Sequence, residues 1–212
     1  MLRTIGLMVA LVAAASLGRA EEMKAAEAAR LVEGYFNSTK TMQAAFSQHT
    51  TGEAFTQEGM FYLSRTGSNP GKFLWDYQTP DKQRLIATGT ALYFVDDANG
   101  GRVTELPIKA GLARLFAGKR LTLAKEGLQV ERAAREDGKL KVDLRVIGNL
   151  GGDDTSGVRR VVLVFDEAPM QLREARVTDA VDAVTVMTFD NVQTGIALDD
   201  KMFRFVPRLK QI

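Results

Sequence analysis

The sequence predicts an α+β fold built on one long antiparallel sheet that curls into an open β-barrel. About eleven short segments have the apolar–polar alternation of strands and are separated by Gly, Pro, Asn or Asp. Only two segments have helical periodicity, one before the strands and one among them. Two helices are too few to cover both faces of so many strands. Because a sheet of about eleven strands rarely stays flat, we expect it to close partly on itself, with the helices at its ends or along one side.

The first twenty residues have the features of a cleavable secretory signal. Arg3 gives a positive start, an apolar run follows at 5–17, and small residues precede the expected cleavage after Ala20. The run is shorter than the roughly 18 apolar residues that a membrane-spanning helix needs. We therefore expect residues 1–20 to be removed on export and residues 21–212 to form a single domain.

The composition of the expected mature chain favours no strongly charged partner. Without the two arginines of the signal, 26 basic side chains face 26 acidic ones, so neither nucleic acid nor an anionic membrane is indicated. The chain has no cysteine. An exported protein without disulfides is held by its core alone, which is typical of the bacterial periplasm. The absence also means that the chain lacks the cysteine that a bacterial lipoprotein carries after its signal.

Two segments have the periodicity of amphipathic helices. Residues 22–38 place apolar side chains, including Tyr35 and Phe36, at spacings of three and four, and residues 109–121 repeat the pattern around Phe116. The predicted strands lie near residues 44–50, 58–65, 72–77, 83–88, 91–96, 102–106, 128–134, 139–147, 158–166, 171–178 and 184–192.

The segment at 72–77 places Phe73, Trp75 and Tyr77 at every second position, so that three rings share one face of a strand. Two interpretations stay open: the rings fill an ordinary core, or they wall a cavity, because a long curled sheet encloses more space than its side chains fill. The candidate cavity residues are Phe46, Met60, Tyr62, Phe73, Trp75, Tyr77, Leu92, Phe94, Leu144 and Phe165. Other inward candidates are Leu140, Val142, Val161, Leu163, Val184 and Val186.

The sequence does not favour an enzyme. His49 is the only histidine, and no nucleophile motif accompanies it. The Asp pairs at 96–97, 153–154 and 199–200 lie among turn residues, where Asp is common for its local hydrogen bonds. No EF-hand spacing, metal cluster or phosphate-binding glycine loop is present, so we expect neither a metal nor a cofactor. A hydrolase that uses a carboxylate and His49 is the enzymatic alternative.

Several motifs occur in an order that resembles a known family. The stretches "YFNSTKTMQAAFSQHTT", "EGMFYLSR" and "PGKFLWDYQTPDKQRLIATGTALYFVDD" are similar to those of the periplasmic outer-membrane lipoprotein carrier proteins, the LolA family. The matching positions are Phe46, Gln48, Gly59, Arg65, Pro70, Phe73, Trp75, Pro80, Gly89, Leu92 and Tyr93. The end, "FDNVQTGIALDDKMFRFVPR", is similar to the closing strand, short helical turn and Phe-x-Phe-x-x-Pro of the family.

The resemblance implies a half-closed barrel with helices as a lid over a hydrophobic cavity. It implies a carrier that accepts triacylated lipoproteins from an inner-membrane ABC transporter of the LolCDE type. Delivery would be to an outer-membrane receptor or to the outer membrane itself. In the family, an arginine on the second strand binds lid carbonyls and keeps the empty carrier closed, and Arg65 matches it. We expect a shuttle of this kind to be a monomer. An envelope lipid or lipoprotein sensor, or a general lipid-binding module on the same fold, is the alternative.

Overall fold

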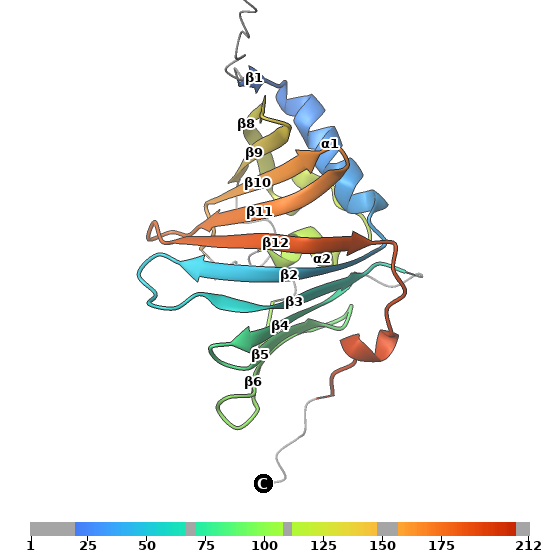
Figure 1. Ribbon diagram of the computed structural model, residues 1–212, viewed down its shortest axis with the longest axis vertical. Coiled ribbons are helices and arrows are strands. Elements are labelled where there is room, and N and C mark those ends of the chain that lie inside the picture. Colours follow the sequence, from blue (N-terminus) through green and yellow to red (C-terminus); the bar gives the residue numbers. More distant parts are fainter. Residues whose placement is uncertain (1–19, 67–70, 108–111, 148–156, 207–212) are drawn as a thin grey trace, which may run out of the picture.

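The computed structural model describes residues 20–66, 71–107, 112–147 and 157–206. In this part of the chain, twelve strands form one sheet in the order β1-β8-β9-β10-β11-β12-β2-β3-β4-β5-β6-β7 (Figure 1). The strands in chain order are β1 (Glu21–Glu22), β2 (Thr41–Thr50), β3 (Gln57–Ser64), β4 (Lys72–Thr79), β5 (Gln83–Ala87), β6 (Leu92–Asp96), β7 (Arg102–Leu106), β8 (Leu128–Glu136), β9 (Lys139–Val146), β10 (Arg160–Glu167), β11 (Met170–Thr178) and β12 (Val184–Thr194). The helices are α1 (Ala25–Ser38), α2 (Ala113–Ala117) and the 3₁₀ turns η1 (Leu123–Glu126) and η2 (Asp200–Phe203).

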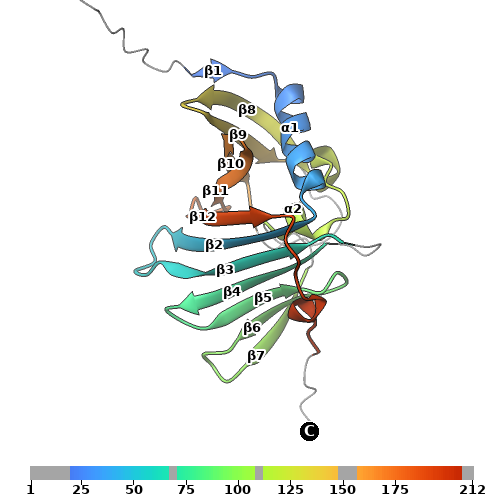
Figure 2. The same cartoon turned by 45° about the vertical axis from the view of Figure 1, so that its right-hand side comes forward.

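The sheet is antiparallel throughout and does not close. Strands β2 to β7 follow one another as one meander, and β8 to β12 form a second. The two meanders join where β12 pairs with β2, so Phe189 lies opposite Phe46. Strands β1 and β7 remain at the two edges, and Figure 2 shows the strands fanning between them. The predicted open, curled sheet is confirmed.

This strand order explains why α2 lies on the concave side of the sheet, in the space that we call the hollow. Strand β7 is one edge of the sheet, whereas β8 lies next to the opposite edge. The chain from β7 to β8 therefore has to pass from one end of the sheet to the other, and it does so with α2 on the way. Ala113, Leu115, Phe116 and Ala117 of α2 are all buried in the main hydrophobic cluster.

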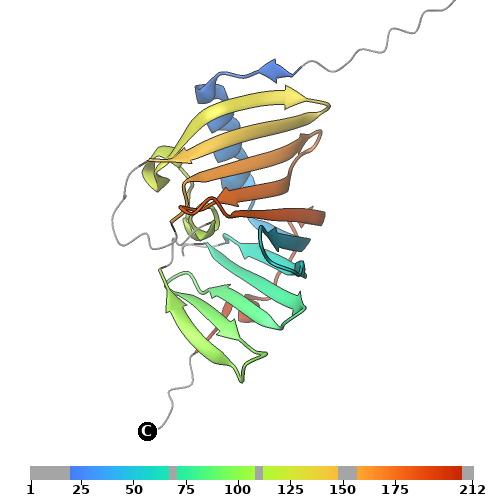
Figure 3. The same cartoon turned by 90° about the vertical axis from the view of Figure 1, so that its left-hand side faces the viewer.

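Helix α1 covers the half of the sheet formed by the second meander. Its buried residues, Ala28, Val32, Tyr35 and Phe36, form one face at helical spacing. The helix ends where the backbone N–H and the hydroxyl of Thr39 both donate to the carbonyl of Tyr35, at 3.1 and 2.8 Å. Figure 3 shows α1 passing behind strands β8 to β12.

Register shifts bend the strands and help the sheet to curl. The extra residues lie in β4, β8, β11 and β12, for example in β4 opposite the step from Glu58 to Gly59. At Gly59 the neighbouring strand is so close that a Cβ atom would lie 2.0 Å from the carbonyl oxygen of Asp76. Only glycine fits at this bend.

Hydrophobic side chains gather on both faces of the first meander. The main cluster fills the concave face and includes Phe46, Phe61, Phe73, Trp75 and residues from both helices. A second cluster lies on the convex face, where Phe203 of η2 packs against Leu74, Ile86 and Val95.

The predicted elements agree well with the observed ones. All eleven predicted strands are present, and the helix expected at 22–38 begins at Ala25. A twelfth strand, β1, was not expected, because two acidic residues carry no alternation pattern. The helix expected at 109–121 is reduced to α2, and residues 109–111 lie outside the described part of the chain. Residues 1–19 also lie outside it, so the secretory signal stays a prediction.

Candidate functional site

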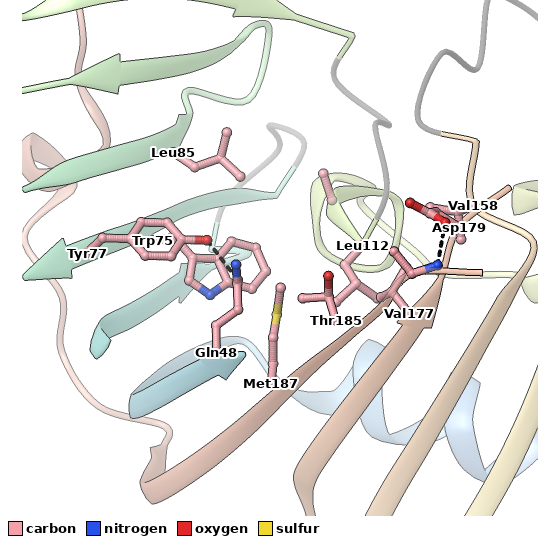
Figure 4. Close-up of a pocket in the computed structure, with 12 residues that line it drawn as sticks. Gln48, Trp75, Tyr77, Leu85, Leu112, Val158, Val177, Asp179, Thr185 and Met187 are labelled. Atoms are coloured by element: carbon pink, nitrogen blue, oxygen red, sulfur yellow. Dashed lines mark hydrogen bonds between the residues drawn. The ribbon is translucent and has the colours of Figure 1, made fainter. Parts of the chain in front are cut away.

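A cavity of about 410 Å³ lies between the sheet and α2 (Figure 4). Its apolar lining consists of Trp75, Leu85, Leu112, Ala113, Val158, Val177, Ala183 and Met187. Its polar lining consists of Gln48, Tyr77, Asp179 and Thr185. The wall thus comes from both meanders of the sheet and from the beginning of α2. A cavity of this size and composition is typical of a site for a small apolar or amphipathic ligand.

The volume of the cavity sets the amount of ligand that it can hold. An apolar protein cavity of about 150 Å³ holds one benzene molecule, so a ligand needs about 25 Å³ per carbon atom. At this rate the cavity of about 410 Å³ has room for about 16 carbon atoms. That is about the size of one fatty acyl chain.

The ring of Phe116 in α2 packs into an aromatic core next to the cavity. It lies 5.0 Å from the ring of Phe61 and 5.4 Å from that of Trp75, measured between centroids. The rings of Phe36 and Phe73 lie 5.5 and 6.2 Å away. Phe116 belongs to the five-residue helix α2 and Phe36 to α1, so helices and not strands carry these two rings of the core.

One buried arginine ties both helices to the sheet. Arg65 follows β3 and is only 8% exposed. Its guanidinium donates to the carbonyl of Phe36 in α1, to that of Leu115 at 2.5 Å and to that of Phe116 at 3.3 Å. These carbonyls belong to the last turns of α1 and α2, where carbonyl groups lack helical partners and carry partial negative charge. Arg65 therefore provides hydrogen-bond donors for the carbonyl groups at the C-terminal ends of both helices. We call α1 and α2 together the lid.

Burial lowers the pKa of the Arg65 guanidinium to about 10. The group is still charged at neutral pH, so its charge is held in the interior by carbonyl dipoles. Buried charges are costly unless they are fully hydrogen-bonded. Moving α1 or α2 away breaks some of these bonds, so the position of the lid and the solvation of Arg65 are coupled.

Gly71 makes the close approach of α2 to the sheet possible. A Cβ atom at this position would lie 2.2 Å from the carbonyl oxygen of Phe116, far inside van der Waals contact. The same atom would lie 3.3 Å from the Cγ atom of Arg65. Gly71 thus leaves room for the carbonyl that Arg65 binds.

A Gly71→Ala variant is expected to push α2 off the sheet and to weaken the hydrogen bonds of Arg65. We expect faster amide hydrogen exchange in α2 and a changed fluorescence of Trp75, the only tryptophan. Gly34→Ala is the matched control, because Gly34 is exposed in α1 and a Cβ atom there meets nothing within 4 Å. The control should gain about 0.5–1 kcal/mol in helix stability. Unchanged exchange in α2 of the Gly71 variant would contradict the tight fit.

Most of the predicted cavity residues lie on the concave face. Phe46, Phe73, Trp75, Leu92, Leu144 and Phe165 are buried in the main cluster, and Tyr77 packs against it. Phe94 shares the face of β6 that Leu92 occupies. Only Trp75 and Tyr77 line the cavity itself. The others form the core around it, so the core and the cavity interpretations each apply to part of the set.

Four predicted residues point the other way. Tyr62 packs against the second cluster on the convex face, and Met60 shares its face of β3, because Gly59 and Phe61 are the inward positions. On β12, Thr185 and Met187 line the cavity, so the alternating Val184 and Val186 face outward. The concave wall therefore does not include Met60 and Tyr62.

The structure also shows cavity residues that the sequence reasoning did not select. Val158, Val177 and Met187 come from the second meander, and Leu112 comes from the start of α2. Side chains alternate between the two faces along β11 and β12. Once the inward face of one strand is known, its pairing with the other shows that Val177 and Met187 both point inward.

The described residues provide no sign of a catalytic or metal centre. His49 is exposed and lies opposite Val186, away from the cavity. Among the described residues, no group of three or more His, Asp or Glu side chains is arranged to hold a metal ion. Nor does any helix in the described ranges have both the length and the apolar character needed to span a membrane.

An open antiparallel sheet with an apolar hollow and a tethered helical lid defines a class of binding proteins for apolar or amphipathic ligands. Comparison with known proteins agrees with this class. The family model described as outer membrane lipoprotein carrier protein LolA matches residues 37–206. The chain belongs to the LolA family.

Curated relatives cover most of the chain. The outer-membrane lipoprotein carrier protein of Methylococcus capsulatus is 31% identical over 183 residues, which are 83% of this chain and 82% of the relative. That of Halorhodospira halophila is 29% identical, over 95% of this chain and 89% of the relative. Among solved structures, a DUF1329 family protein from Desulfovibrio piger shares the fold at a TM-score of 0.51 and 12% identity, covering 85% of this chain and 97% of that one.

Proposed function

We propose that the protein is a periplasmic carrier that takes up the acyl chains of lipoproteins released from the inner membrane and delivers them to the outer membrane. Its cargo would be triacylated lipoproteins, its donor an inner-membrane ABC transporter of the LolCDE type, and its acceptor an outer-membrane receptor or the membrane itself. Membership of the LolA family supports this function. The observation that carries it is the contact of Arg65 with both lid helices above an apolar cavity.

The cost of moving acyl chains through water explains why such a carrier is needed. Transfer from lipid to water costs about 0.8 kcal/mol for each methylene, so three chains cost about 30 kcal/mol or more. Non-covalent affinity levels off near −20 kcal/mol. A carrier that covered all three chains at their full hydrophobic value would not release them.

Closure of the lid provides the free energy that opposes binding of the acyl chains. The closed cavity has room for about one chain. Admitting more requires α2 to withdraw Phe116 from the aromatic core and to give up hydrogen bonds with Arg65. Loading is therefore expected to need work from the donor, and closure of the lid then favours release to the acceptor membrane. A carrier of this design binds; it needs no catalytic group.

Release of lipoproteins from membranes tests this function. The purified mature protein is added to spheroplasts depleted of their own carrier, the membranes are pelleted, and the supernatant is probed for a triacylated lipoprotein. We expect a soluble complex of one lipoprotein with one carrier. If the folded protein releases no lipoprotein but co-purifies with free lipid in native mass spectrometry, the alternative of a lipid sensor or general lipid binder replaces the carrier.

A further inference from the structure

One side of the cavity carries a set of polar groups that are joined to one another. The hydroxyl of Tyr77 donates to Gln48 Oε1 at 3.1 Å, and Gln48 Nε2 donates to Gln57 Oε1 at 2.8 Å. Burial raises the pKa of the Tyr77 hydroxyl, so it stays a neutral donor. Figure 4 shows the Gln48 side chain beside the indole of Trp75. The cavity thus has apolar walls and one edge with neutral hydrogen-bonding groups.

The indole N–H of Trp75 is the exception in this set. The side chain is 2% exposed, and no acceptor among the described residues forms a hydrogen bond with its Nε1 atom. A buried donor without an acceptor costs free energy, and such groups are rare in folded proteins. The cost is recovered when a ligand brings the missing acceptor to the edge of the cavity.

The charges around the cavity limit what this acceptor can be. Of the described residues that line it, Asp179 is the only charged one, and it is an acid. A carboxylate or phosphate would meet no cation among the described lining residues and would be repelled by Asp179. A neutral carbonyl oxygen on an otherwise apolar molecule fits the indole donor and the apolar walls together.

We propose that Trp75 Nε1 donates a hydrogen bond to the carbonyl oxygen of a fatty acyl group, an ester or an amide, whose hydrocarbon tail lies in the cavity. This inference rests on the proposed function and adds a group that recognises the acyl linkage as well as the chain. Since Nε1 is covered in the empty protein, a neighbouring side chain has to move. Gln48 lies beside the indole, and its side chain gives way by exchanging its hydrogen bonds with Tyr77 and Gln57.

The single tryptophan makes the proposal directly testable in the wild-type protein. Uniformly ¹⁵N-labelled mature protein gives one indole N–H signal. It is titrated with 1-dodecanoylglycerol (an ester), N-(2-hydroxyethyl)dodecanamide (an amide) and 1-O-dodecylglycerol (an ether without the carbonyl). We expect the indole proton to move downfield with a lipid that has the carbonyl and not with the ether. The ester and the amide distinguish the two sources of the carbonyl.

A Trp75→Phe variant supplies the affinity test, because it keeps an aromatic ring and removes the N–H. We expect binding of the carbonyl lipid to weaken by about fivefold to tenfold and binding of the ether to stay unchanged. Equal shifts with all three lipids, or equal affinity losses in the variant, would overturn the proposal and leave the carrier function standing. Failure of every lipid to bind, together with no release from spheroplasts, would overturn both.

Discussion

Replacing Arg65 with leucine is expected to open the lid and to turn the protein into a carrier that holds its cargo. The variant loses three hydrogen bonds from a buried charged donor and leaves three helix-end carbonyls without partners. We expect the closed state to become less stable than the open state by about 3–5 kcal/mol compared with the wild type. Because closure opposes binding, affinity for an acylated peptide should rise at least tenfold, while transfer to acceptor membranes falls. Titration and a vesicle-transfer assay measure the two effects.

Two further substitutions make the Arg65 result specific. Arg65→Lys keeps the charge but loses the planar fork, so it should recover only part of the closed state. Arg84→Leu is the matched control, because Arg84 lies on the convex face and pairs with Asp97 at a partly exposed position. The control should behave like the wild type. Equal affinity and transfer in the Arg65→Leu variant and the wild type would show that the arginine does not hold the lid.

Replacing Phe116 with alanine is expected to produce the second large effect. The ring is 2% exposed among four other aromatic side chains, so its loss should destabilise the empty protein by about 3–5 kcal/mol. The space it leaves is expected to extend the cavity beside α2. We therefore expect a long-chain acyl lipid to raise the melting temperature of the variant more than that of the wild type. Thermal unfolding with and without lipid measures the difference.

Phe203→Ala is the control for Phe116→Ala. Phe203 is equally buried, at 1% exposure, but it lies in the second cluster on the convex face. Loss of the Phe203 ring should destabilise the protein by a similar amount. Added lipid should raise the melting temperature of this variant no more than it raises that of the wild type. If lipid rescues both variants equally, Phe116 does not occupy ligand space.

The burial of the aromatic strand decides what an Asp substitution at Phe73 or Trp75 would test. The structure shows them 0% and 2% exposed within the core. A carboxylate there would be buried without a partner, so Phe73→Asp is expected to unfold the protein.

The fold was predictable because most strands bury one face only. Segment 139–146 alternates apolar and charged residues in the sequence, although Asp143 is buried together with its apolar neighbours. The number of such segments made a curled sheet the reasonable expectation. The two-residue strand β1 was not predictable, since it is defined by its pairing with β8 and not by any pattern of its own.

The orientation of side chains in the first meander was harder to predict. Strand β4 buries three consecutive residues, Phe73, Leu74 and Trp75, because η2 covers its convex face. A strand with two apolar faces has no alternation that tells inside from outside. Strand β3 also carries apolar side chains on both faces, with Phe61 in the main cluster and Tyr62 against the second, and Met60 and Tyr62 were placed on the wrong face.

The lid contacts depend on long-range packing that sequence patterns do not contain. Arg65 was selected only through the family resemblance, and its local sequence does not indicate that it meets α1 and α2. Helix α2 reaches it because the chain between β7 and β8 crosses the hollow. Helix α1 reaches it because α1 ends just before β2, which pairs with β3. The apolar stripe around Phe116 was recognisable in the sequence, but not that Leu115 and Phe116 enter the main cluster while Leu112 lines the cavity.

A distance measurement between α2 and the sheet shows whether acyl chains displace the lid. The chain has no cysteine, so cysteines introduced at Lys119, just after α2, and at Lys141, on β9, carry the only spin labels. Both side chains are exposed. We expect pulsed electron paramagnetic resonance to show one narrow distance distribution in the empty protein and a longer, broader one after loading with a triacylated lipopeptide. Arg65→Leu should shift the empty protein in the same direction. An unchanged narrow distribution in a protein shown to be loaded would contradict the lid mechanism.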